Sequence, residues 1–112
     1  MRENKLAELS MEFAVKAINF CSTIKGHYSL INQLERSATS IGANISEAQR
    51  AQSKADFNAK MNISLKEANE TYYWLRLLHR TDFISDEAFN SIEKDVNEII
   101  SILVSICKQT NK

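Results

Sequence analysis

The chain has 112 residues, which is enough for one domain that buries a core without disulfides or metals. Its 14 basic side chains are balanced by 14 acidic ones, so the total charge does not indicate a strongly basic nucleic-acid-binding protein. The opening stretch MRENKLAELSMEF is charged throughout, and no apolar run approaches the roughly 20 residues that cross a bilayer. We therefore expect a cytoplasmic protein with no membrane partner.

The absence of proline and the presence of only two glycines favour helices. Apolar residues recur at steps of three and four from Leu6 to Ile24, which predicts a first helix over about residues 4–25. Gly26 can adopt the left-handed conformation that ends a helix, and Ser29 is a suitable N-cap for a second helix over about residues 30–52. The apolar stripe of the second helix comprises Leu30, Leu34, Ala38, Ile41, Ile45 and Ala48.

Two further helices complete the chain. Ser53 and Asp56 have the form of a capping box and mark the start of a third helix, over about residues 54–80. Ser85 precedes two acidic residues and opens a fourth helix, over about residues 86–109. The fourth helix has apolar residues at strictly alternating steps of three and four: Phe89, Ile92, Val96, Ile99, Leu103 and Ile106. Because joints this short force antiparallel neighbours, we predict an all-α fold, an antiparallel up-down-up-down four-helix bundle, as a single domain over residues 1–112.

The two cysteines are expected to be small buried residues with free thiols. Cys21 and Cys107 occupy apolar helical positions near the C-terminal ends of the first and fourth helices. In an up-down-up-down bundle these two ends lie at opposite poles, so a disulfide between them is out of reach.

Wound at 100° per residue, the third helix has apolar side chains on two sides. Its core stripe comprises Met61, Leu65, Ala68, Tyr72 and Leu75. The opposite side carries Ile63, Trp74, Leu77 and Leu78, together with the carboxylates Glu67 and Glu70. We interpret this second face as an interface between subunits, because apolar patches of this kind mark contact sites. The alternative is that Trp74 and Leu78 flank a wide core stripe and are half covered by a neighbouring helix.

The second helix places a row of polar residues beside its apolar stripe rather than opposite it. The row comprises Ser37, Ser40, Asn44 and Glu47, with Arg36 and Gln33 on the same side. Small serines let another helix approach closely, and Asn44 can form a hydrogen bond across such a contact. A solvated polar flank explains the same composition equally well, so both interpretations stay open.

Two motifs resemble those of a known family. The segment SIGANISE, from Ser40 to Glu47, fits the form S-I-x-[AS]-N-I-[AS]-E, although many members have Pro where this chain has Gly42. The segment SLKEANETYYWLRLL, from Ser64 to Leu78, is similar to the KEAxETxYWLxLL pattern of one branch. Over about residues 5–108 the chain resembles the four-helix-bundle proteins encoded in intervening sequences of bacterial 23S ribosomal RNA genes. It is more distantly similar to the accessory variability determinant of diversity-generating retroelements.

The resemblance implies a homo-oligomer, for which a homopentameric ring is the precedent in the family. It also implies that the signature residues Arg36, Ser40, Asn44 and Glu47 serve structure and assembly rather than catalysis.

Two non-catalytic functions are compatible with the charge distribution. Residues 25–80 carry a net charge of +3 and residues 82–98 a net charge of −5. In one hypothesis the protein is an accessory factor that contacts RNA, DNA or a nucleic-acid enzyme through basic faces that a ring multiplies. The candidate contacts are Arg50, Lys54, Lys60, Lys66, Arg76 and Arg80. In the other hypothesis it is a scaffold that recruits a protein partner, through the oligomer or through the acidic fourth helix.

The sequence argues against an enzyme. His27 and His79 are the two histidines, and neither belongs to the Glu-x-x-His pairs with which di-iron bundles bind metal. Two glycines cannot form a glycine-rich phosphate-binding loop. We therefore expect no catalytic activity, no metal and no cofactor.

Overall fold

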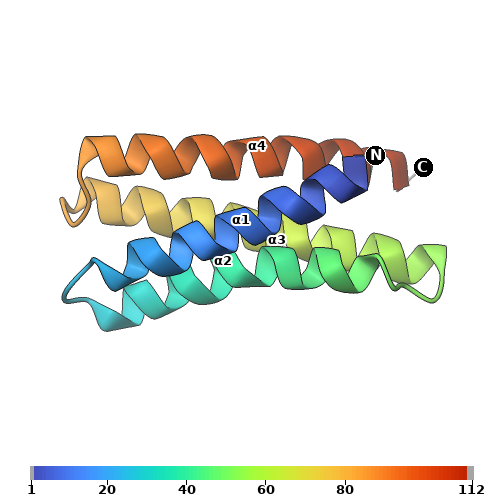
Figure 1. Cartoon of the computed structure of the whole chain (residues 1–112), viewed down its shortest axis with the longest axis horizontal. Coiled ribbons are helices and arrows are strands. Elements are labelled where there is room, and N and C mark those ends of the chain that lie inside the picture. The colour runs from blue at the N-terminus through green and yellow to red at the C-terminus, as the bar shows by residue number, and fades with distance from the viewer. Residues whose placement is uncertain (1, 111–112) are drawn as a thin grey trace.

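The computed structural model describes the backbone of residues 2–110 and the side chains of residues 4–110. Four helices make up this region: α1 (Arg2–Ser22), α2 (Tyr28–Ala48), α3 (Lys54–Arg80) and α4 (Asp86–Thr110). Successive helices run in opposite directions, so that both chain ends lie at the same end of a body measuring 43 × 21 × 20 Å (Figure 1). The predicted antiparallel four-helix bundle is confirmed.

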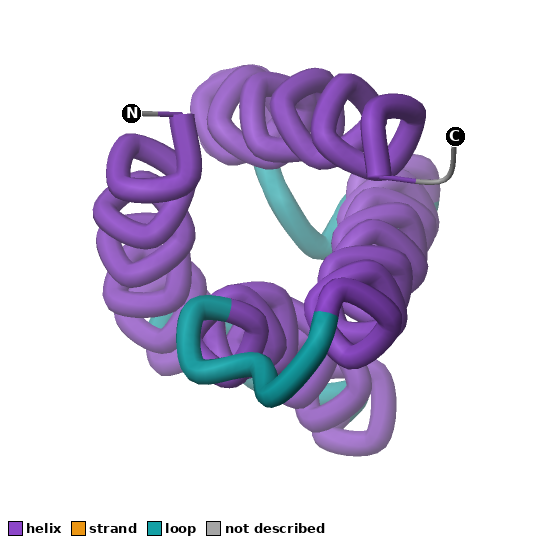
Figure 2. The backbone as a smooth tube through the Cα atoms, turned by 90° about the vertical axis from the view of Figure 1, so that its right-hand side faces the viewer, coloured by secondary structure: helices purple, strands orange, loops and turns teal. Residues whose placement is uncertain are grey.

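The helices occupy the corners of a rough square, in chain order (Figure 2). Each helix contacts its two neighbours in that order, and within residues 2–110 the backbones of α1 and α3 do not approach each other. The contact between α2 and α3 is the most extensive, and the contact between α1 and α4 is the smallest. The last pair is loosely packed because α1 crosses the bundle obliquely, from beside the C-terminal end of α4 toward the start of α2 (Figure 1).

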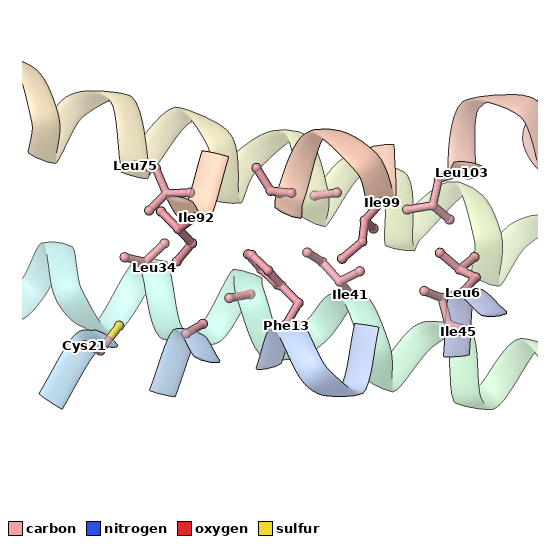
Figure 3. Packing of buried hydrophobic residues seen from close by; sticks show 14 of the residues in the cluster. Leu6, Phe13, Cys21, Leu34, Ile41, Ile45, Leu75, Ile92, Ile99 and Leu103 are labelled. Carbon is pink, nitrogen blue, oxygen red and sulfur yellow. The ribbon is translucent and has the colours of Figure 1, made fainter. Parts of the chain in front are cut away.

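The core consists of one apolar stripe from each helix. The α4 stripe, from Phe89 to Ile106, is buried at every predicted position. Phe13, Ile41 and Ile99 point into the space between the helices from three of the four elements (Figure 3). Large side chains at steps of three and four keep one side of each helix turned inward, which is why this periodicity specifies the bundle.

The joint between α1 and α2 differs from the prediction. Gly26 adopts the expected left-handed conformation, with φ of 90°. The N-cap of α2, however, is His27 rather than Ser29, and the helix begins at Tyr28. The His27 carbonyl accepts hydrogen bonds from the amides of Leu30 and Ile31, and its ring packs edge-on against Phe83 at 4.3 Å between centroids. These contacts fix His27 in a left-handed conformation and start the helix two residues early.

The joint between α2 and α3 is capped as the sequence predicts. Ser53 is the N-cap of α3, and its Oγ accepts a hydrogen bond from the Asp56 amide at 3.0 Å. The Asp56 carboxylate reaches back to the amide of Gln52 at 3.3 Å. Helix α2 ends at Ala48 rather than near residue 52, because the chain needs the intervening residues to reverse direction.

The core face of α3 is rotated from the predicted one. The buried residues of α3 are Met61, Ser64, Ala68, Thr71, Leu75 and Leu78. Leu65 and Tyr72, which the winding had placed in the stripe, are half-buried at its edge. The prediction that Leu78 belongs to an exposed interface is wrong, since the side chain is fully buried inside the subunit. The hydroxyls of Ser64 and Thr71 form hydrogen bonds with α2, and Leu78 lies on the same side of α3 as these two residues.

Both cysteines are buried and have free thiols, as predicted. Cys21 lies in the last turn of α1 and Cys107 in the last turn of α4, and these turns are at opposite ends of the bundle (Figure 1).

Candidate assembly and nucleic-acid interfaces

The outer side of α3 carries an apolar surface, here called the α3 patch: Ile63, Tyr73, Trp74 and Leu77. Ile63 is 43% exposed and Tyr73 is 56% exposed, whereas Trp74 and Leu77 are half-buried. Trp74 packs partly against the core, its Nε1 donates to the Glu70 carboxylate at 3.4 Å, and its ring meets Tyr73 edge-on. The structure thus brings Ile63, Trp74 and Leu77 onto one surface, with the half-buried Glu67 at its edge toward α2 and the half-buried Glu70 between Leu77 and Ile63. Tyr73 belongs to this surface but was missed from the sequence.

A second apolar surface lies on the outer side of α1. Met11, Val15 and Ile18 are 64%, 53% and 46% exposed, and their spacing of four and three puts them in one line along the helix. We call these three residues the α1 row. From the sequence we predict only the stripe from Leu6 to Ile24 on this helix and miss the α1 row, although the helical winding used for α3 would find it.

One residue of the polar row of α2, Ser37, is buried against α3 within the subunit. Ser37 is buried and accepts a hydrogen bond from the Thr71 hydroxyl at 3.0 Å, while the Ser64 hydroxyl donates to the Ile41 carbonyl at 2.9 Å. These small hydroxyl-bearing residues let the two helices approach closely. The contact interpretation of the row is therefore correct for Ser37.

The four signature residues have different surroundings. The Asn44 side chain donates to the Ser40 carbonyl of its own helix at 2.8 Å, and Ser40 itself is half-buried. Glu47 is exposed and lies 3.8 Å from the Lys60 ammonium group of α3. Arg36 is exposed. A role for these residues in assembly stays a prediction.

The candidate nucleic-acid contacts do not form one surface. Arg50 and Lys54 lie at the turn between α2 and α3, Lys60 is paired with Glu47, and Lys66 is exposed in the first half of α3. Arg76 and Arg80 lie toward the other end of α3, about 33 and 39 Å from Lys54 at 1.5 Å per residue. There they line a shallow hollow of about 180 Å³ together with Tyr73 and Leu77.

Titratable groups gather where α3 meets α4 at this same end. The His79 Nε2 atom lies 2.6 Å from the Asp86 carboxylate, and the His79 ring stacks on Phe89 at 4.1 Å. The Tyr72 hydroxyl donates to Glu93 at 2.9 Å, and this hydrogen bond, followed by burial, raises the pKa of Tyr72. Each interaction joins α3 to α4.

Two other features bear on function. A groove of about 220 Å³ separates α1 from α4, with Glu12 on its rim and an ion pair between Lys16 and Asp95 across it. Among the described side chains, no three of His, Cys, Asp and Glu are placed to hold a metal ion. In the same part of the chain, no helix is long and apolar enough to cross a membrane.

Comparison with known proteins shows the family and the fold of this chain. Residues 2–105 match the family model described as 23S rRNA-intervening sequence protein. A crystal structure of a protein of unknown function from the S23 ribosomal protein family of Bacteroides thetaiotaomicron superposes with a TM-score of 0.91. The two sequences are 49% identical, and the match covers 96% of this chain and 99% of that chain. No curated protein matches the chain.

Proposed function

Because this chain belongs to the family of 23S rRNA-intervening sequence proteins, we propose that it is a non-catalytic scaffold that works as a homo-oligomer. The observation that carries the proposal is the α3 patch, in which apolar side chains lie exposed on a helix that already supplies a complete stripe to the core. Water-exposed apolar surface of this kind is stabilised when another protein covers it. A ring of five subunits is the arrangement implied by the resemblance to the family.

The surroundings of the titratable groups favour a structural role over catalysis. His79, Asp86, Tyr72 and Glu93 are engaged with one another across the contact between α3 and α4. The thiols of Cys21 and Cys107 are buried, and burial raises their pKa values, which makes them poor nucleophiles near neutral pH.

Light scattering on wild-type protein and on Ile63→Glu tests the proposal. The subunit mass is 12.8 kDa, and we expect a multiple of it for the wild type. A glutamate at position 63 puts a charge in the α3 patch, so the variant should lose subunits while keeping its helix content by circular dichroism. Trp74→Glu should do the same. Asn97→Glu adds the same charge on the exposed side of α4 and should assemble like the wild type. A wild-type monomer contradicts the proposal.

The alternative function is binding of nucleic acid. It is favoured by the hollow in which Arg76 and Arg80, one helical turn apart, flank the exposed ring of Tyr73. Arginines contact phosphates, and an exposed aromatic ring can stack on an unpaired base. Such a site suits single-stranded RNA or DNA.

Fluorescence anisotropy with labelled single-stranded RNA tests this alternative over a range of salt concentrations. Binding should weaken steeply as the salt concentration rises. The double variant Arg76→Ala/Arg80→Ala should reduce the slope of the logarithm of the binding constant against the logarithm of the salt concentration by about 1 to 2. Lys94→Ala removes an exposed cation from acidic α4 and serves as the control. No binding at low salt would eliminate the alternative.

A further inference from the structure

We propose that copies of this chain join head to tail, with the α1 row of one copy packed against the α3 patch of the next. This inference rests on the proposed self-assembly and specifies which surfaces meet. It makes the α1 row, which has no role in the subunit core, one half of the assembly interface.

The first argument is that the two apolar surfaces lie on opposite corners of the bundle. Helices α1 and α3 are diagonal in the square of helices (Figure 2). Because each turns its buried stripe toward the centre, their exposed sides lie on opposite corners. A two-fold contact uses the same surface on both partners, so it would cover one of these surfaces and leave the other in water. A head-to-tail contact covers both in every copy that has two neighbours.

The second argument is that the two surfaces lie at the same height. Ser10 of α1 lies against Gly42 of α2. The carbonyl of the adjacent residue, Ile41, accepts a hydrogen bond from the Ser64 hydroxyl of α3. Position 10 on α1 is therefore level with position 64 on α3. Both helices begin at the same end and run in the same direction, so Met11 to Ile18 is level with about residues 65–72 (Figure 1). This range falls between Ile63 and Tyr73, so the two ends of the row, Met11 and Ile18, come within about two residues of the height of Ile63 and Tyr73, while its middle is level with Lys66 and Glu70.

Rotation about an axis parallel to the bundle preserves these heights. It brings α1 of one copy beside α3 of the next, running in the same direction and inclined to it as α1 is inclined to the bundle. Successive copies close into a ring when the rotation divides the full circle.

The third argument is charge complementarity along the edges of the two surfaces. Glu8 and Glu12 are exposed beside the α1 row, and Glu12 lies on the side of α1 that faces α4. Lys66 is exposed between the helical positions of Tyr73 and Leu77, in the half of the α3 patch toward α4, and by the same register it is level with Glu12. Under the rotation these flanks meet, so carboxylates face an ammonium group. The other flank of the patch, with Glu67, then meets the side of α1 toward α2, which carries Ala7 and Ala14. Glu70 lies between the helical positions of Leu77 and Ile63 and faces the middle of the α1 row.

Complementation between two blocked variants tests the proposal. Val15→Glu blocks the α1 row, and Tyr73→Glu blocks the α3 patch; both positions are exposed, so neither change disturbs the core. Each variant alone should be monomeric by light scattering. An equimolar mixture should give a dimer of twice 12.8 kDa with one copy of each, because each variant keeps the surface that the other lacks. The two blocked surfaces both carry the new glutamate, so they repel each other and the dimer does not grow.

Circular dichroism and thermal melting check that both variants fold, and Asn97→Glu serves as the matched control. Assembly of Val15→Glu like the wild type would overturn the proposal in favour of a contact between two α3 patches. Assembly of Tyr73→Glu like the wild type would overturn it in favour of a contact between two α1 rows. A mixture that stays monomeric also overturns it. In all three cases the wild type still assembles and the proposed function stands, whereas a wild-type monomer removes both.

Discussion

The Thr71 hydroxyl of α3 lies 3.0 Å from the Ser37 hydroxyl of α2, and both side chains are buried in the most extensive contact between helices of this bundle. The same Thr71 oxygen is 2.8 Å from the Glu67 carbonyl, and Ser37 donates in turn to the Leu34 carbonyl. When Thr71 donates its one proton to Ser37, the two hydroxyls form a short chain of hydrogen bonds that ends on the Leu34 carbonyl, and the Glu67 carbonyl is the alternative acceptor for the same proton. This chain lets two small polar residues replace bulky apolar ones and brings the helices close together.

Thr71→Val should lower the free energy of unfolding by about 1 kcal/mol. Valine keeps the shape of threonine but leaves the Ser37 hydroxyl without its donor in a buried site. Urea unfolding at fixed protein concentration measures the change. Thr39→Val is the control, because the Thr39 hydroxyl bonds only to carbonyls of its own helix and its change should stay below about 0.5 kcal/mol. Equal losses in the two variants would contradict a special role for the Ser37 contact.

Gly42→Ala should stabilise the protein by about 0.5 to 1 kcal/mol. A Cβ atom at this position would lie 3.4 Å from Ser10 Oγ, which is ordinary contact, and alanine favours a helix interior more than glycine does. Gly42→Leu should destabilise, because a larger side chain has to push α1 away from α2.

Gly26→Ala is the matched control for Gly42→Ala. Nothing lies within 4 Å of a Cβ atom at position 26, yet its φ of 90° disfavours alanine, so this variant should be less stable than the wild type. Thermal melting of the three variants checks the order. A loss of stability in Gly42→Ala as large as in Gly42→Leu would show that α1 and α2 are closer than the structure has them.

Stability should fall between about pH 9 and pH 11. Burial, together with the charge of Glu35, raises the pKa of the Cys21 thiol from 9.0 to about 11. Below pH 9 the Cys21 thiol is protonated in both the folded and the unfolded protein, so the stability that it contributes is fully present. Above pH 9 the thiol ionises in the unfolded protein but stays protonated in the folded protein up to about pH 11. Unfolding therefore becomes more favourable as the pH rises through this range. The loss is of the order of 2 kcal/mol by pH 11.

Urea unfolding under reducing conditions at pH 8, 9.5 and 11 measures this effect. Cys21→Ala should show a smaller decline over the same range, although Cys107 and Tyr72, whose pKa values are also raised, keep part of it. An identical decline in the variant would exclude Cys21 as its source.

Local patterns predicted the parts of the fold that depend on neighbours along the chain. The stripe from Phe89 to Ile106 was placed correctly because steps of three and four define one side of a helix whatever packs against it. The Ser53 cap was placed correctly because its hydrogen bond spans only three residues. The N-cap of α2 was misplaced because His27 is held by Phe83, a residue more than fifty positions away.

The angular position of the α3 core face could not be read from α3 alone. Leu65 and Tyr72 are more apolar than Ser64 and Thr71, so composition turned the predicted stripe toward them. In the folded chain, Ser64 and Thr71 donate hydrogen bonds to a carbonyl and a hydroxyl of α2. Leu78 is buried on the same side of α3. The predicted interface therefore lost one residue, while Ile63, Trp74 and Leu77 remained on the outer surface.

By itself the sequence determined the number and order of the helices, their antiparallel connection and the presence of more apolar surface on α3 than one core face needs. These properties follow from periodicity, capping and short joints, which act within a few residues of the chain. Only the tertiary structure decided which polar groups are buried against a partner and which apolar residues stay exposed. It also decided that the α1 row and the α3 patch lie on opposite corners at one height. Such relations depend on distances between helices, and no single helix carries that information.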